Sequence, residues 1–252
     1  MKRTFLALCA VLLTVGVMAR DLPYQGFGIQ VGFAQPILRL DPDPTPWVGT
    51  APYQYYSLGL DNKTKANGVK VGVVYDVTYV KGFGSSIGLN YTYAAAKSSW
   101  EQVGTVAEYP IARKHTKYHA LELYVDWQYK FEVAKETYII LYTGPSIQYA
   151  VSLKSYVTTK GLADQPETLL PNSEYSHYGN NDKPDENMKA LNVTWGVGAG
   201  FQYQRFFLRG GYDFGLINPY RNRTFEGSSL STGGRLDQWQ IKLGVYLWYD
   251  ND

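Results

Sequence analysis

Eight charged residues alternate with apolar residues, so that they share one side of the segments that carry them. They are four basic and four acidic residues, Lys70, Lys130, Arg209, Lys242, Asp76, Glu122, Asp126 and Asp213. Two kinds of chemistry fit such a set: the lining of a charged pore, or an enclosed network of ion pairs and hydrogen bonds. Enclosure requires a partner for every charge, because an unpaired buried charge is costly. Gln30, Asn90 and Gln240 lie on the same side as further polar partners.

Histidine, the commonest general base in enzymes, occurs only at His115, His119 and His177. His119 lies on the apolar side of its segment, near one end, where a lipid A deacylase could place its base. A serine nucleophile is missing, since Leu121 occupies the second position after His119. A base without an adjacent nucleophile does not form a catalytic pair. We therefore predict an interfacial histidine and no enzymatic activity.

Two other patterns suggest ligand sites but lack the required context. The glycines at every second position of segment 196–200 superficially resemble a phosphate-binding loop. Such a loop needs a turn from strand to helix, whereas these glycines lie within one strand-like segment and leave room for larger neighbouring side chains. Asp182, Asp185 and Glu186 lack the ordered spacing of a calcium loop. We predict no cofactor and no metal.

Aromatic and basic residues in the long connections are candidates for binding partners. The candidates are Tyr53, Tyr55, Tyr56, Tyr175, Tyr178, Arg221 and Arg223. Tyrosine is enriched in binding surfaces, although tyrosines that pack a rigid loop would give the same pattern. The two arginines, together with Arg235, are suited to pair with lipopolysaccharide phosphates; solvated loop charge is the alternative.

The elements that must position these residues are strands, because apolar and polar residues alternate with period two. The alternating segments are 27–34, 69–79, 87–94, 121–131, 138–151, 191–203, 206–216 and 239–249. Each has about the length of a tilted strand that crosses a bilayer. In the fifth segment Ile139 and Ile140 are both apolar, and we assign Ile139 to the apolar face. In the last segment the alternation places Tyr249 on the apolar face and Trp248 on the polar face.

The chain begins with the pattern of a cleaved signal peptide at residues 1–19. Lys2 and Arg3 precede an apolar run that ends at Ala19, and this run is too short to span a membrane. Cleavage would remove two basic residues and change the net charge from +2 to zero, and it would also remove Cys9, the only cysteine. The exported chain, residues 20–252, would then contain no disulfide. Its balanced charge argues against a nucleic-acid partner.

Connection lengths also alternate. The long connections are near residues 36–67, 95–117, 152–188 and 218–235, and the short ones are near 81–82, 133–136 and 204–205. Transmembrane barrels join their strands in this way, with the long loops outside the cell. A soluble barrel or sandwich would expose many Lys and Glu residues opposite its apolar face, but here that side is mostly Gly, Ala, Asn, Gln and Thr. Aromatic residues also gather near the segment ends, as in interfacial girdles.

Three stretches carry a resemblance to a known family: Tyr142-Thr143-Gly144-Pro145, Gly196-Val197-Gly198-Ala199-Gly200 and Tyr212-Asp213-Phe214-Gly215-Leu216-Ile217-Asn218. The chain resembles the Bacteroidetes-type outer-membrane β-barrel proteins, the small porin-family group with OmpX-like and PorT-like barrels. The resemblance implies the architecture and the location, and similarity to PorT implies an accessory role in a secretion machine. Such barrels usually end on an aromatic residue, whereas here residues 250–252 follow Tyr249.

We therefore expect an all-β protein, a transmembrane antiparallel up-and-down β-barrel of about eight strands, monomeric and in the outer membrane. Residues 53–60 leave ten strands as an alternative. An eight-stranded barrel is just wide enough for its own side chains, so we expect a plugged polar interior and a non-enzymatic protein. Its long loops would bind surface ligands, envelope components, lipopolysaccharide or extracellular proteins. A small-solute pore, a secretion accessory subunit and a lipid A-modifying enzyme are the alternatives.

Overall fold

The computed structural model describes residues 24–40, 63–80, 82–102, 111–160, 167–169, 174–176, 178, 188–220, 223–225, 228–230 and 233–250. The expected signal peptide lies outside these residues. No helix in the described part is long and apolar enough to cross a membrane.

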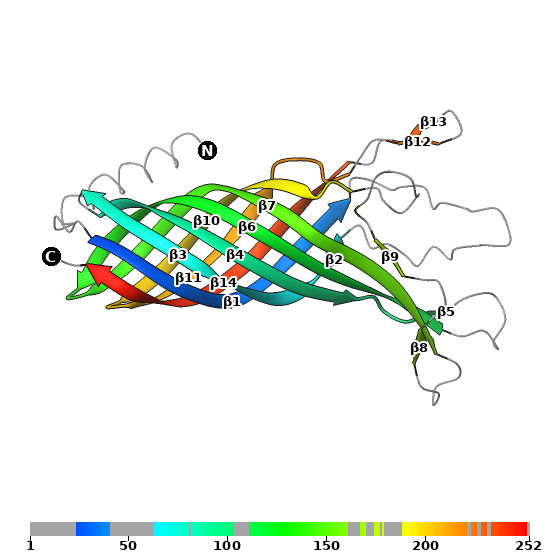
Figure 1. The fold of residues 1–252 in the computed structure, drawn as a ribbon, viewed down its shortest axis with the longest axis horizontal. Helices are drawn as coiled ribbons and strands as arrows, with labels where there is room; N and C mark the ends of the chain where they lie inside the picture. Colours follow the sequence, from blue (N-terminus) through cyan, green and yellow to red (C-terminus); the bar gives the residue numbers. More distant parts are fainter. Residues whose placement is uncertain are drawn as a thin grey trace, which may run out of the picture.

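Eight long antiparallel strands form a closed barrel in the described part of the chain (Figure 1). They are β1 (Tyr24–Leu40), β3 (Asn67–Val80), β4 (Phe83–Lys97), β6 (Ile111–Ala134), β7 (Thr137–Lys160), β10 (Leu191–Tyr203), β11 (Phe206–Gly215) and β14 (Gly234–Asp250). Each strand pairs with its neighbour along the chain, and β14 closes the ring by pairing with β1. The all-β barrel of eight strands that the alternation predicts is therefore confirmed.

Short strands are attached to the barrel or lie beyond it. They are β2 (Lys63–Lys65) on β1, β5 (Glu101–Gln102) on β6, β8 (Thr168–Leu169) and β9 (Tyr175–Ser176) on β7, and the separate pair β12 (Arg223–Phe225) and β13 (Ser228–Leu230). The alternative hairpin at residues 53–60 lies outside the described residues.

Tight turns join the strands at one end of the barrel. Gly82, Glu136 and Gln204 adopt positive φ angles of 80°, 57° and 52° there, in the left-handed region that tight turns require. β1 begins and β14 ends at this same end of the barrel (Figure 1). The short connections expected near 133–136 and 204–205 are thus two-residue turns.

At the opposite end, the strands continue into segments that the sequence pattern assigns to loops. β1 extends to Leu40, β6 begins at Ile111, and β7 extends to Lys160. These three strands therefore run past the loop boundaries expected near residues 36, 117 and 152. In the β6 extension, polar residues occupy both faces, as in Arg113-Lys114-His115-Thr116-Lys117. Backbone pairing maintains this part of the strand, and no hydrophobic alternation marks it.

Burial follows the opposite rule to that of a soluble protein. Apolar side chains such as Ile29, Val71 and Leu123 are exposed on the outside, whereas charged and amide side chains fill the interior. Exposed apolar bands of this kind are stable against acyl chains and not against water. The choice made in the fifth segment is confirmed, since Ile139 is 42% exposed and Ile140 is completely buried.

One orientation differs from the sequence expectation. A β-bulge in β14 pairs Phe27 with Trp248 and Gly28 with Tyr246, so that Leu247 is the additional residue. After this bulge Trp248 faces outward, and Tyr249 packs against a buried cluster inside the barrel. The simple alternation is therefore wrong for these two residues, because a single inserted residue exchanges the two faces.

Candidate functional site

The charged residues expected to share one surface are all buried inside the barrel. Near the turn end, Asp76 is the centre of a group contributed by several strands. Arg209 donates to Asp76 Oδ2 from Nη2 at 2.6 Å, and Lys130 Nζ lies 3.4 Å from the same oxygen. Tyr246 also donates its hydroxyl to this oxygen. Lys130 donates further to Gln202 at 2.8 Å. One carboxylate thus contacts two buried cations.

A second group lies around Glu122. Lys70 Nζ lies 2.9 Å from both Glu122 oxygens and donates to Gln240 at 2.8 Å. The Asn90 and Gln148 side chains donate to Glu122 at 2.8 and 2.9 Å. This ion pair therefore has the additional hydrogen bonds that a buried pair needs to offset its desolvation.

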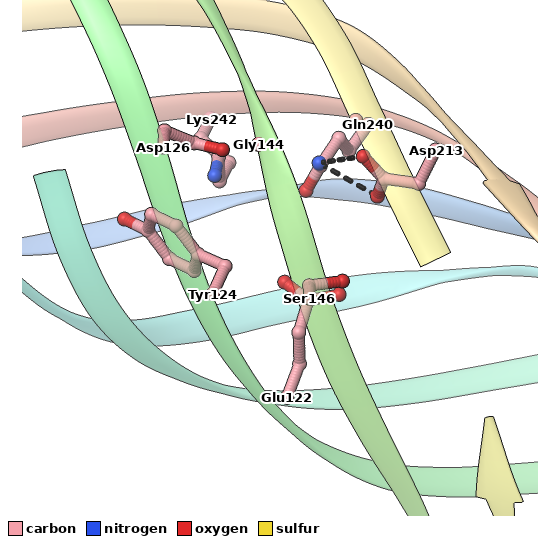
Figure 2. A pocket seen from close by; sticks show the side chains of 9 residues that line it. Glu122, Tyr124, Asp126, Gly144, Ser146, Asp213, Gln240 and Lys242 are labelled. Atoms are coloured by element: carbon pink, nitrogen blue, oxygen red, sulfur yellow. Dashed lines mark hydrogen bonds between the residues drawn. The ribbon is translucent and has the colours of Figure 1, made fainter. Parts of the chain in front are cut away.

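A small cavity separates the remaining charges. It is lined by Glu122, Tyr124, Asp126, Gly144, Ser146, Gly196, Asp213, Gln240 and Lys242. Figure 2 shows Gln240 pointing at Asp213, to which it donates at 3.0 and 2.8 Å. Lys242 Nζ lies 4.3 Å from the centre of the Tyr124 ring. The cavity volume is about 10 Å³, the space of about one water molecule.

Two apolar clusters lie inside the barrel beside the polar groups. The inner cluster, which contacts the Asp76 group through Tyr246, consists of Val74, Tyr124, Phe207 and Tyr246. The outer cluster, towards the long connections, consists of Ala66, Ala94, Tyr118, Ala120, Ala150, Leu153, Met188, Tyr220 and Leu236. Neither cluster is predicted by the sequence pattern. Phe207 could have been found, because its neighbours Phe206 and Leu208 both belong to the outward face.

Glycines provide the space that the interior aromatic rings occupy. A Cβ atom on Gly244 would lie 2.1 Å from Phe207 Cζ, and one on Gly198 would lie 2.2 Å from Tyr142 Cζ. Both distances are far below van der Waals contact. The alternating glycines therefore serve packing, as the sequence context indicated, and no strand-to-helix turn is present in this described segment.

The two described histidines lie in different surroundings. His119 Nδ1 lies 2.6 Å from the Tyr91 hydroxyl, and its ring centre is 4.9 Å from that of Tyr93. His115 is buried, and its ring stacks on Tyr156 at 4.7 Å. His177 lies outside the described residues. No cluster of three or more His, Cys, Asp or Glu residues suited to a metal occurs in the described part.

A polar cluster that the sequence pattern does not predict attaches β8 to the outer part of β6 and β7. Glu167 accepts two hydrogen bonds from Arg113, at 3.1 and 2.5 Å. It also contacts the Thr158 hydroxyl at 2.5 Å and His115 Nε2 at 2.9 Å. Hydrogen bonds from Arg113, then from Thr158, lower the pKa of Glu167 from its ordinary 4.5 to about 2.

The loop candidates are only partly described. Tyr53, Tyr55, Tyr56 and Arg221 lie outside the described residues, and Arg223 begins β12. Tyr175 lies in β9, where its backbone pairs with Ser155 of β7. Tyr178 is half-buried against the outer cluster, and burial raises its pKa. Tyr178 thus contributes to packing at the barrel mouth.

Comparison with known proteins places this geometry in a family. The family model described as outer membrane protein beta-barrel domain matches residues 24–221. No curated protein matches the chain.

Among solved structures, the chain is similar to Ail, the attachment invasion locus protein of Yersinia pestis, with 10% identity over 87% of this chain and 97% of that one and a TM-score of 0.35. A structure of Ail in complex with the heparin analogue sucrose octasulfate gives 11% identity, 88% and 97% coverage and a TM-score of 0.36. The chain is also similar to Neisserial surface protein A, with 10% identity over 89% of this chain and 99% of that one and a TM-score of 0.34. Because the family model covers most of the chain, this protein belongs to the outer membrane protein beta-barrel domain family and resides in the outer membrane.

Proposed function

We propose that this protein is a non-enzymatic outer-membrane barrel with a closed interior that binds surface ligands, envelope components or protein partners on its outer side. The observation that carries the proposal is the combination of a filled interior with a β6–β7 hairpin much longer than the membrane requires. The first feature argues against transport, and the second provides a surface outside the membrane.

The interior is filled by alternating apolar and charged groups. The outer apolar cluster lies towards the long connections, and along β3 and β6 the Glu122 group is followed by the inner apolar cluster and then by the Asp76 group. The cavity beside Glu122 has space for about one water molecule. A hydrated ion or a small solute would have to displace buried ion pairs and both apolar clusters, so we expect no steady conduction.

The long hairpin provides the second argument. β6 and β7 have 24 residues each, whereas a tilted strand crosses a bilayer with about 9–11. The outward apolar positions end at Leu121 in β6 and at Val151 in β7. At about 3.3 Å per residue, the roughly ten residues beyond these positions extend some 30 Å along the direction of the strands. Figure 1 shows the two strands, in green, running past the ends of their neighbours.

Photo-cross-linking in intact envelopes tests the binding surface. A photoreactive phenylalanine analogue is placed at Leu169 of β8, or as a matched control at Val133 near the turn end, since the two side chains are 57% and 56% exposed. We expect adducts with proteins or envelope polymers from position 169 and not from position 133. Equal labelling at both positions, or none at position 169, would contradict the proposal.

Two assays separate this proposal from its alternatives. In planar bilayers we expect no large, stable single-channel steps, and such steps would instead support a small-solute pore. Incubation with lipid A should release no acyl chain, and a released chain would support an enzyme. The Bacteroidetes-type origin and the PorT-like secretion role stay predictions from the sequence, and adducts with secretion subunits at position 169 would support that role.

A further inference from the structure

Rows of directly paired residues cross β4, β6 and β7 on the outside of the barrel. Further along the strands than the last apolar positions, away from the turns, one row contains Tyr93, His119 and Ser152. The next row contains Ala95, Lys117 and Lys154, and the row after that contains Lys97, His115 and Tyr156. Successive rows are two residues apart, about 7 Å along a strand. The first basic row therefore begins about 7 Å beyond the row of His119.

The row of Lys117 and Lys154 contains two like charges directly opposite each other. Such a pair destabilises a sheet, unless an anion lies between or beside the two ammonium groups. Lys154 Nζ lies 3.4 Å from Glu174, but these side chains are 55% and 61% exposed, and exposed pairs of this kind contribute little. Lys117 Nζ lies 5.3 Å from the centre of the Tyr156 ring.

The acidic residues near these rows are too few to balance the lysines. Among the described residues, no carboxylate lies within ion-pair distance of Lys97 or Lys117. Glu167, the other carboxylate near this part of the hairpin, is held by Arg113. The described side chains therefore leave a positive charge on the outward face, immediately beyond the apolar band.

On the membrane side of the lysines, aromatic residues lie at the membrane boundary. Tyr91 and Tyr93 are exposed on the outside and contact His119, the former by a hydrogen bond of 2.6 Å. Tyrosine rings at such positions lie at the level of the lipid headgroups. A cation one row further out is then at the height at which a lipid phosphate emerges from the acyl layer.

We infer that Lys117 and Lys154, with Lys97 beside them, bind a phosphate group of an outer-leaflet glycolipid such as lipid A. The occupant follows from charge and position. Lysine ammonium groups bind phosphate as point charges, the site faces the lipid, and the apolar band directly below it accommodates the acyl chains of the same molecule. A phosphate between the two lysines also removes the repulsion of the cross-strand pair.

Binding of diphosphoryl lipid A to the purified protein in a zwitterionic detergent tests this inference. Each lysine near a membrane surface contributes about 1 kcal/mol to anionic lipid binding. For K117Q/K154Q we therefore expect a Kd about 30-fold higher than for the unmodified protein. The matched control is K135Q, which removes an exposed lysine at the turn end of the same hairpin and should leave the Kd unchanged. K117R/K154R should restore binding.

Other measurements identify the source of the phosphate and verify folding. Heat-dependent gel mobility should show that all variants are folded, because the exchanged side chains are exposed. Lipid A without phosphates should bind the unmodified protein as weakly as K117Q/K154Q binds the phosphorylated form, and millimolar inorganic phosphate should not displace lipid A. Equal affinity of K117Q/K154Q and the unmodified protein, undiminished binding of dephosphorylated lipid A, or displacement by inorganic phosphate would overturn the inference. None of these outcomes bears on partner binding by the hairpin.

Discussion

Arg209 and Asp76 are separated by 133 positions in the sequence and meet at 2.6 Å in the barrel, where neither side chain is exposed. Asp76 also receives Lys130 and the Tyr246 hydroxyl. The ion pair therefore links β3 to β11 across the interior, and Lys130 and Tyr246 connect it to β6 and β14. A contact of this kind stabilises the closed barrel and at the same time obstructs its axis.

Loss of the central carboxylate should destabilise the protein strongly. In Asp76→Asn the cations of Arg209 and Lys130 stay buried without their counter-charge, and removing one partner of a buried pair costs about 3–5 kcal/mol. We expect a decrease of this size in the free energy of unfolding, measured by urea titration in lipid vesicles. Glu174→Gln, in an exposed pair, is the control and should change it by less than about 1 kcal/mol. Similar values for both variants would contradict the described network.

The strand glycines should tolerate a methyl group only where space exists, whether they face the interior, as Gly244 does, or the outside, as Gly210 does. In Gly244→Ala the new Cβ would lie 2.1 Å from Phe207, and overpacking of this kind typically costs about 1–3 kcal/mol. The matched control is Gly210→Ala, whose Cβ would have no neighbour nearer than 3.9 Å and which should be close to neutral. Urea unfolding midpoints measure both. A neutral Gly244→Ala would mean that Phe207 is not packed against this strand.

A charged side chain on the lipid-facing side should lower the free energy of unfolding. Leu123 lies in the outward apolar band of β6, one outward position inside its outer end at Leu121, and an arginine in such a band costs up to about 2–4 kcal/mol in a transmembrane barrel. We expect Leu123→Arg to reduce the free energy of unfolding in vesicles by this amount. Thr168→Arg on exposed β8 should have little effect. If Leu123→Arg folds with unchanged stability, the outward face does not contact acyl chains.

Attachment of β8 should depend on pH in a range set by Glu167. The folded pKa of about 2 lies below the ordinary 4.5, so the contribution of this carboxylate is fully present above pH 4.5 and is lost as the pH falls towards 2. Hydrogen exchange at the paired residues Thr158 and Leu169 should stay slow at pH 5 and accelerate below pH 4, relative to the intrinsic rates at each pH.

Two variants examine this attachment. Glu167→Gln should accelerate exchange of the β7–β8 pair at pH 5 and remove the pH dependence, because no titrating carboxylate remains. Glu174→Gln should keep the behaviour of the unmodified protein, since Glu174 lies beside β9 and contacts Lys154 of β7, away from the β7–β8 pair. An unchanged pH profile in Glu167→Gln would assign the attachment to other groups.

The sequence by itself determined the faces of the strands and the direction of the barrel. Period-two alternation assigns each strand residue to lipid or interior, because successive side chains point to opposite faces. It therefore places Lys70 and Glu122 inside and Leu123 outside, and the alternation of connection lengths identifies the turn end. The exception, Trp248 and Tyr249, depends on a bulge that leaves no mark in residue type.

Only the tertiary structure decided which residues meet. Whether Lys70 pairs with Glu122 or with Asp213 depends on the stagger between strands around the closed ring, and residue types do not encode that stagger. The same register places Lys117 opposite Lys154. The sequence also does not predict the outer extensions of β6 and β7, because strands with polar residues on both faces have no hydrophobic period. It does not predict the contact of Glu167 with Arg113 either, because the pairing of a connecting segment depends on where the fold brings it.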